Sequence, residues 1–125
     1  MSMSVDEYVN AYRLLCSQLM IASDDFDEKN VQRHNRAMQR LIALQESMKE
    51  DGINTVEIYA RLLNDEDIGV RQNAAIDCLL DLHIHTKQSL KILRWIGRHG
   101  DVAQKADVKR ALLIWKGKLR PDEPF

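Results

Sequence analysis

The sequence predicts an all-α protein of about six helices arranged in three antiparallel pairs. Apolar residues recur at steps of three and four without period-two alternation, which is typical of helices that bury one face. Both prolines lie among the last five residues and the chain has only five glycines, so long stretches can stay helical. The 125 residues, 45% of them apolar, suffice for one domain. We predict that domain over residues 1–119, followed by a flexible tail at 120–125.

Polar segments that contain capping residues separate the predicted helices. The Ser4–Glu7 capping box opens the first helix, and Asn54–Glu57 opens the third. Thr86 is expected to cap the fifth helix, and Asp101 the sixth. Gly52 suits the left-handed residue that follows a helix end. The helices are therefore expected at about residues 5–22, 28–49, 55–63, 68–82, 87–99 and 102–116.

Composition narrows the classes of partner. The 18 basic and 19 acidic residues give a formal charge of -1, which disfavours a nucleic acid or an anionic membrane as partner. No apolar run approaches the ~20 residues that cross a bilayer, and the first residues do not resemble a signal peptide. We therefore predict a cytoplasmic protein with no membrane partner. Cys16 and Cys78 lie far apart in apolar helical patterns, so both are predicted to be buried, reduced thiols.

No motif in the sequence predicts catalysis. Phosphate-binding glycine loops and zinc-spaced cysteines do not occur in it. His83 and His85 would share a face only in a strand, and we expect a solvated turn between two helices instead. Asp77 and Asp81 are expected to be surface carboxylates, and His34 a buried, hydrogen-bonded histidine. We therefore predict no enzyme activity, no cofactor and no metal.

In residues 62–75, an apolar helix end and an acidic turn precede Val70 and Arg71, and two alanines, Ala74 and Ala75, follow in the next helical turn. This pattern resembles a HEAT repeat. Small residues at these positions let a helix approach its neighbour closely. In such a repeat, Arg71 is expected to reach a carboxylate of an adjacent repeat.

The resemblance extends along nearly the whole chain. Residues 34–36, the Val70–Arg71 block and residues 115–119 look like a bacterial domain-of-unknown-function family, number twenty-nineteen, whose members are short HEAT-like helical solenoids. This resemblance implies a short HEAT-like α-solenoid. It implies no activity and no catalytic residue.

Charge is unevenly distributed along the chain. Residues 1–67 carry a net charge of -6, and residues 68–125 a net charge of +5. Four cations of the predicted fifth helix, which we call the basic stripe, follow one line at steps of four, three and four: Lys87, Lys91, Arg94 and Arg98. Lys105 and Lys109 of the next helix add to them. The stripe is either a solvated face or a docking surface for acidic protein or phosphate groups.

Acidic residues gather in the turns within the predicted helix pairs, which emerge on one edge of the solenoid. This acidic edge, our candidate partner-binding surface, comprises Asp24, Asp25, Phe26, Asp27, Asp65, Glu66 and Asp67. Helix starts favour carboxylates in any case, so capping is an alternative explanation for part of the cluster.

These features predict a non-enzymatic protein-interaction module, because helical solenoids provide extended binding surfaces without built-in chemistry. A specific form of this hypothesis is a bacterial immunity protein that neutralises a cognate toxin, whose basic surface the acidic edge would contact. The alternative is nucleic-acid backbone binding through the basic stripe. A third hypothesis is a structural subunit whose groove is filled by its own copy, so monomer and homodimer both stay open.

Overall fold

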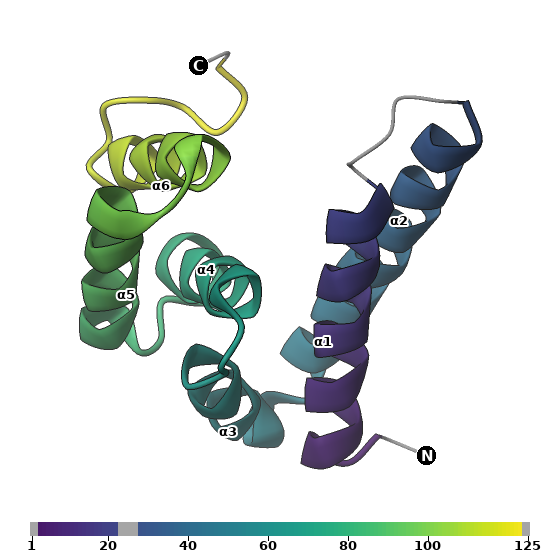
Figure 1. Cartoon of the computed structure of the whole chain (residues 1–125). Helices are drawn as coiled ribbons and strands as arrows, with labels where there is room; N and C mark the ends of the chain where they lie inside the picture. The colour runs from purple at the N-terminus through teal and green to yellow at the C-terminus, as the bar shows by residue number, and fades with distance from the viewer. Residues whose placement is uncertain (1–2, 23–27, 124–125) are drawn as a thin grey trace. The chain divides into compact units, whose positions relative to one another are not determined.

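The computed structural model describes residues 3–22 and 28–123, apart from the side chains of residues 20–22 and 30 (Figure 1). Over these ranges its regular secondary structure is all helical, with six α-helices and no strand, which confirms the predicted fold class. The helices are α1 (Val5–Ala22), α2 (Glu28–Glu50), α3 (Gly52–Leu63), α4 (Ile68–Ile76), α5 (Thr86–His99) and α6 (Val102–Trp115). A π-helical segment, η1 (Asp77–Leu82), continues α4.

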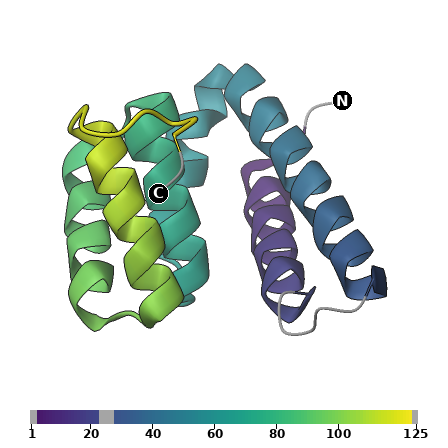
Figure 2. The same cartoon turned by 90° about the horizontal axis from the view of Figure 1, so that it is seen from above.

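The chain forms two compact units, Met1–Arg61 and Leu62–Phe125. Helices α1 and α2 lie side by side in the first unit, whereas α5 packs on both α4 and α6 in the second (Figure 2). Each unit is thus built from packed helices. The single domain over residues 1–119 stays a prediction.

In the first unit, α1 begins at the predicted capping box. The Glu7 amide donates to Ser4 Oγ at 3.2 Å, and the Ser4 amide donates to Glu7 Oε1 at 3.1 Å. The buried face of α1 carries Tyr8 and Tyr12. The hydroxyl of Tyr8 is hydrogen-bonded to the Ser47 hydroxyl of α2 at 3.1 Å. This bond and the apolar contacts together hold the two helices in register.

The start of α3 differs from the prediction. The amides of Asn54 and Thr55 donate to the Asp51 carbonyl at 3.0 and 3.1 Å, so the helix already includes Gly52. Asn54 lies in the first turn and donates its side-chain amide to the Asp51 carboxylate at 3.3 Å. The capping box at Asn54 and the left-handed Gly52 were therefore wrong, because Asp51 supplies the acceptors at this helix start.

In the second unit, two aspartates cap helices as the sequence suggested. Asp67 Oδ1 accepts from the Val70 amide at 3.1 Å at the start of α4. Asp101 and Gln104 form a full capping box at the start of α6. Between these helices, the core contains the side chains of Ala74, Ala75, Leu79, Leu93, Ile96 and Val108.

The turn between η1 and α5 is unusual. His83 and His85 have φ values of 54° and 50°, in the left-handed region that non-glycine residues rarely adopt. His85 is the N-cap residue of α5, so Thr86 is its first helical residue and the prediction that Thr86 caps the helix was wrong. This turn determines where α5 begins.

The predicted tail follows α6 and is described as far as Glu123. Arg110 of α6 donates to the Pro121 carbonyl at 2.7 Å and to the Glu123 carbonyl at 3.0 Å. These bonds hold the described part of the tail against α6. Residues 124–125 lie outside the described residues.

Both cysteines are buried, as predicted, and neither forms a disulfide within the described ranges. Burial raises the pKa of the Cys78 thiol to about 12, and the negative charge of Asp77 adds to the rise. The neighbouring Ser89 hydroxyl partly offsets this shift. Because only the thiolate is a good nucleophile, Cys78 is expected to be unreactive in the folded protein.

We predict that Ala74→Arg lowers the free energy of unfolding by at least about 3 kcal/mol, measured by urea denaturation. Ala74 is completely buried, so a long charged side chain would have to enter a close-packed core. The control is Ala106→Arg, at an exposed position of α6, which should change stability by less than about 0.5 kcal/mol. Equal effects of the two substitutions would contradict the packing described here.

A second prediction concerns Cys78 and is tested in a Cys16→Ala variant. At pH 8, Ellman's reagent should label folded Cys78 at least about 100-fold more slowly than in guanidinium, because labelling requires local opening. The Cys78 shift should also make stability fall as pH rises from about 9 to about 12, since the unfolded thiol ionises before the folded one. Equal labelling rates in the folded and denatured protein would contradict a buried thiol.

Candidate functional site

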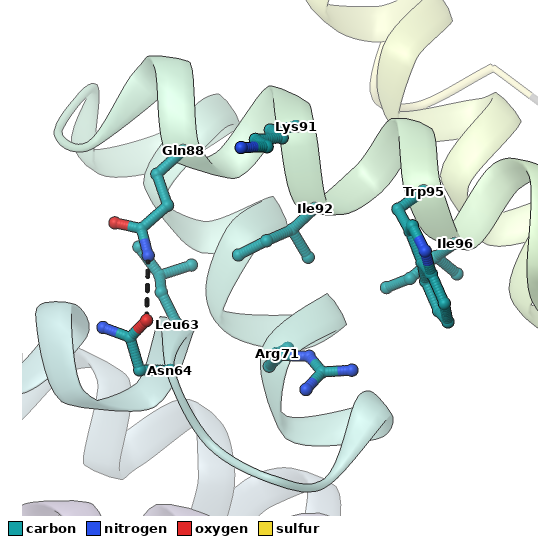
Figure 3. A pocket seen from close by; sticks show the side chains of 8 residues that line it. All are labelled: Leu63, Asn64, Arg71, Gln88, Lys91, Ile92, Trp95 and Ile96. Carbon is teal, nitrogen blue, oxygen red and sulfur yellow. Dashed lines mark hydrogen bonds between the residues drawn. The ribbon is translucent and has the colours of Figure 1, made fainter.

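The second unit contains an open groove along α5, with a volume of about 330 Å³ (Figure 3). We call it the α5 groove; its lining residues are Leu63, Asn64, Arg71, Gln88, Lys91, Ile92, Trp95 and Ile96. Its volume lies at the lower end of the roughly 300–1,000 Å³ of sites that bind small ligands. It is large enough for a few side chains of a partner.

The amphipathic pattern of α5 explains why its residues line the groove. Leu93 and Ile96 are completely buried, which fixes the rotation of the helix about its axis. Gln88, Lys91 and Trp95 recur at steps of three and four, so they follow one line along the helix surface. At 1.5 Å per residue, Gln88 and Trp95 are separated by about 10 Å along the axis.

A hydrogen bond between two lining residues marks one end of the groove. Gln88 Nε2 donates to Asn64 Oδ1 at 3.3 Å and thereby connects the first turn of α5 to the residue after α3 (Figure 3). Trp95 lies at the other end, and 43% of its surface is exposed. The indole stacks on His99, with ring centroids 4.6 Å apart and planes 21° apart. Because His99 Nδ1 is also hydrogen-bonded to the Trp95 carbonyl at 3.0 Å, the imidazole keeps one face of the indole covered.

Two cations flank the apolar part of the groove. Arg71 donates from Nη1 to the Asp65 carbonyl at 3.0 Å, which holds its guanidinium beside the turn before α4. This contact joins the start of α4 to the turn that precedes it, and it differs from the expected bond to a carboxylate of an adjacent repeat. Lys91 is exposed and has no ion pair with any described residue. Ile92 lies between the two cations (Figure 3). The groove can thus accept an apolar group together with negative charge.

The basic stripe is present on α5. Lys87, Lys91, Arg94 and Arg98 are all exposed, and none forms an ion pair within the described ranges. Lys91 alone among the four lines the α5 groove. The stripe therefore extends along the surface beside the groove and shares one residue with it. Lys105 and Lys109 are also exposed, on α6.

The acidic edge is described in part. Asp24, Asp25, Phe26 and Asp27 lie outside the described residues. The carboxylate of Asp65 accepts from the Asp67 amide at 2.9 Å, and that of Asp67 caps α4. Glu66 is exposed. Two of the three described carboxylates thus accept backbone hydrogen bonds, and the role of this edge in partner binding stays a prediction.

The other candidate residues are the histidines and aspartates outside the groove. No group of three or more potential metal ligands occurs among the described residues. His34 is half-buried, and its Nδ1 has no hydrogen-bond partner in the described structure, contrary to the predicted hydrogen-bonded histidine. His83 is exposed in the left-handed turn, and Asp77 is half-buried whereas Asp81 is exposed.

Sequence analysis missed Trp95 and the groove. It identified the cations of the fifth helix but did not consider the tryptophan one turn after Lys91. The step of four from Lys91 was the available signal, because it places both side chains on the same side of the helix. The contribution of Arg71 required knowledge of how α4 packs on α5.

No protein-family model matches this chain, no curated protein matches it, and no solved structure matches it. The resemblance to the HEAT-like family therefore stays a prediction. Within the described residues, no helix is both long and apolar enough to span a membrane.

Proposed function

We propose that this chain is a non-enzymatic protein-interaction module whose α5 groove binds a segment of a partner protein. The observation that carries the proposal is an open groove in which an exposed tryptophan lies beside two cations. Tryptophan and arginine are the residues most often found at the energetic centres of protein interfaces. The concave groove can surround a partner side chain and exclude water from it.

The rigidity of the groove supports the proposal. Its residues belong to packed helices or are held by hydrogen bonds, as for Gln88 with Asn64 and Arg71 with Asp65. Trp95 is held by stacking on His99. A binding surface that is already ordered loses little side-chain entropy when its partner binds.

An immunity protein that neutralises a toxin is a specific form of this proposal. The groove would bind one segment of the toxin, and the acidic edge would contact a basic part of its surface. Exposed charges such as that of Glu66 would act mainly on the association rate.

The proposal predicts that Trp95→Ala abolishes the capture of a partner protein that the unaltered chain binds. The tagged chain is expressed in its own host, and bound proteins are compared by quantitative mass spectrometry. Trp115→Ala is the matched control, because Trp115 is 41% exposed and does not line the groove. We expect at least one protein to be captured by wild type and Trp115→Ala and lost with Trp95→Ala. Identical protein sets for both variants would contradict a role of the groove.

The basic stripe supports a second candidate function, nucleic-acid backbone binding. Its four cations extend over about 16 Å of α5 and are unpaired among the described residues, so they could follow a phosphate backbone. The net charge of -6 on residues 1–67 opposes such binding through long-range repulsion.

We expect no micromolar binding to generic single- or double-stranded DNA at about 0.15 M salt, measured by fluorescence anisotropy. The opposite result would be micromolar affinity that falls by about 0.7 to 0.9 log units per log unit of salt for each phosphate contact. If reversal of Lys87, Arg94 and Arg98 to glutamate then abolished binding, the nucleic-acid function would replace the protein-interaction proposal.

A further inference from the structure

We infer that the α5 groove selects an acidic–apolar segment of its partner, in which one large apolar side chain is flanked by carboxylates. This inference rests on the proposed function and specifies the chemistry of the partner. It follows from the distribution of apolar and charged side chains around the groove.

The apolar part of the groove requires an apolar anchor. Leu63 and Ile96 are buried, and Ile92 is half-buried. Trp95 borders this apolar area at one end (Figure 3). A leucine or phenylalanine side chain placed here would lose its contact with water, which stabilises a complex by roughly 1.5–3 kcal/mol when burial is complete.

The two cations of the groove favour a bound segment that carries carboxylates beside its apolar anchor. Lys91 is on α5 and Arg71 is on α4, so the cations flank the apolar area from two different helices (Figure 3). No acidic side chain is among the lining residues. A neutral or basic segment would exclude water from both cations without replacing it by negative charge, which is unfavourable. Acidic residues next to the anchor would supply that charge.

The length of the groove limits the recognised segment to a few residues. About 10 Å separates Gln88 from Trp95, which equals three residues of extended chain. One anchor side chain and its nearest neighbours therefore carry the recognition.

Nucleic acid fits the groove less well than an acidic peptide does. The base of the groove is formed by aliphatic side chains, which cannot pair with base edges. One face of Trp95 is covered by His99, so a base can stack on the other face alone. Three of the four stripe cations do not line the groove.

The experiment measures the binding of three hexapeptides to the full chain by isothermal titration calorimetry. All have blocked termini: Glu-Asp-Leu-Phe-Glu-Asp is acidic and apolar, Glu-Asp-Ser-Gly-Glu-Asp is acidic without an anchor, and Lys-Arg-Leu-Phe-Lys-Arg is basic with the same anchor. We expect the first peptide to bind at least about tenfold more tightly than either of the others, because only it satisfies both the apolar area and the cations.

A matched pair of variants locates the binding site. Lys91→Glu should weaken binding of the first peptide at least about tenfold, because it places a like charge beside the peptide's carboxylates. Lys87→Glu makes the same charge reversal on the same helix, one turn earlier and outside the groove. This control should change the affinity of the first peptide less than about threefold. Circular dichroism spectra of both variants should match that of the wild type.

Several outcomes would overturn the inference. Equal binding of all three peptides would remove the selectivity, and equal effects of Lys91→Glu and Lys87→Glu would place binding on the basic stripe. Tighter binding of oligothymidylate than of the first peptide, lost with Lys91→Glu, would make nucleic acid the ligand. A further outcome is that a host protein is captured by the wild type and lost with Trp95→Ala while the first peptide binds no more tightly than the other two. In that case the protein-interaction function stands, and the acidic–apolar chemistry is wrong.

A second copy of the chain is the remaining alternative occupant. The chain's own residues Asp24, Asp25, Phe26 and Asp27 have an acidic–apolar composition. Sedimentation equilibrium tests this alternative over a range of concentrations. A dimer that dissociates with both Phe26→Ser and Lys91→Glu would replace the partner protein by a second copy. We expect a monomer under these conditions.

Discussion

The burial of one side of α5 against α4 and α6 is the constraint on which the second unit depends. Leu93 and Ile96 are completely buried, and the small Ala74 and Ala75 of α4 permit a close helix–helix approach. Once this face is fixed, the remaining surface of the helix must face solvent. That surface carries the basic stripe and Trp95, so the packing of the core also determines the lining of the α5 groove.

The turn before α5 shows how strongly this packing is favoured. A left-handed conformation costs roughly 1–2 kcal/mol for each non-glycine residue, and both His83 and His85 adopt it. The π-helical segment η1 continues α4 and precedes this turn. Burial of each large apolar side chain of α5 contributes about 1.5–3 kcal/mol, which is enough to offset the strained turn.

Local interactions were predictable from sequence, whereas long-range ones were not. The helical period predicted six helices, and short-range hydrogen bonds at Ser4, Asp67 and Asp101 follow from residue type and spacing. The start of α3 was misplaced because Asp51 competes with Asn54 as the capping residue. The groove could not be predicted because Arg71 and Lys91 are brought together by tertiary packing alone.

The acidic and basic residues of the second unit have different structural roles. Asp65 and Asp67 accept backbone hydrogen bonds at a helix start, so the fold itself explains their presence. An exposed lysine is solvated at little cost, and the lack of an ion pair does not by itself indicate a binding site. Lys91 differs from the other stripe cations because aliphatic side chains lie beside it. When a partner excludes water there, the lower local dielectric strengthens the attraction between Lys91 and a carboxylate, which makes the groove more selective than the open stripe.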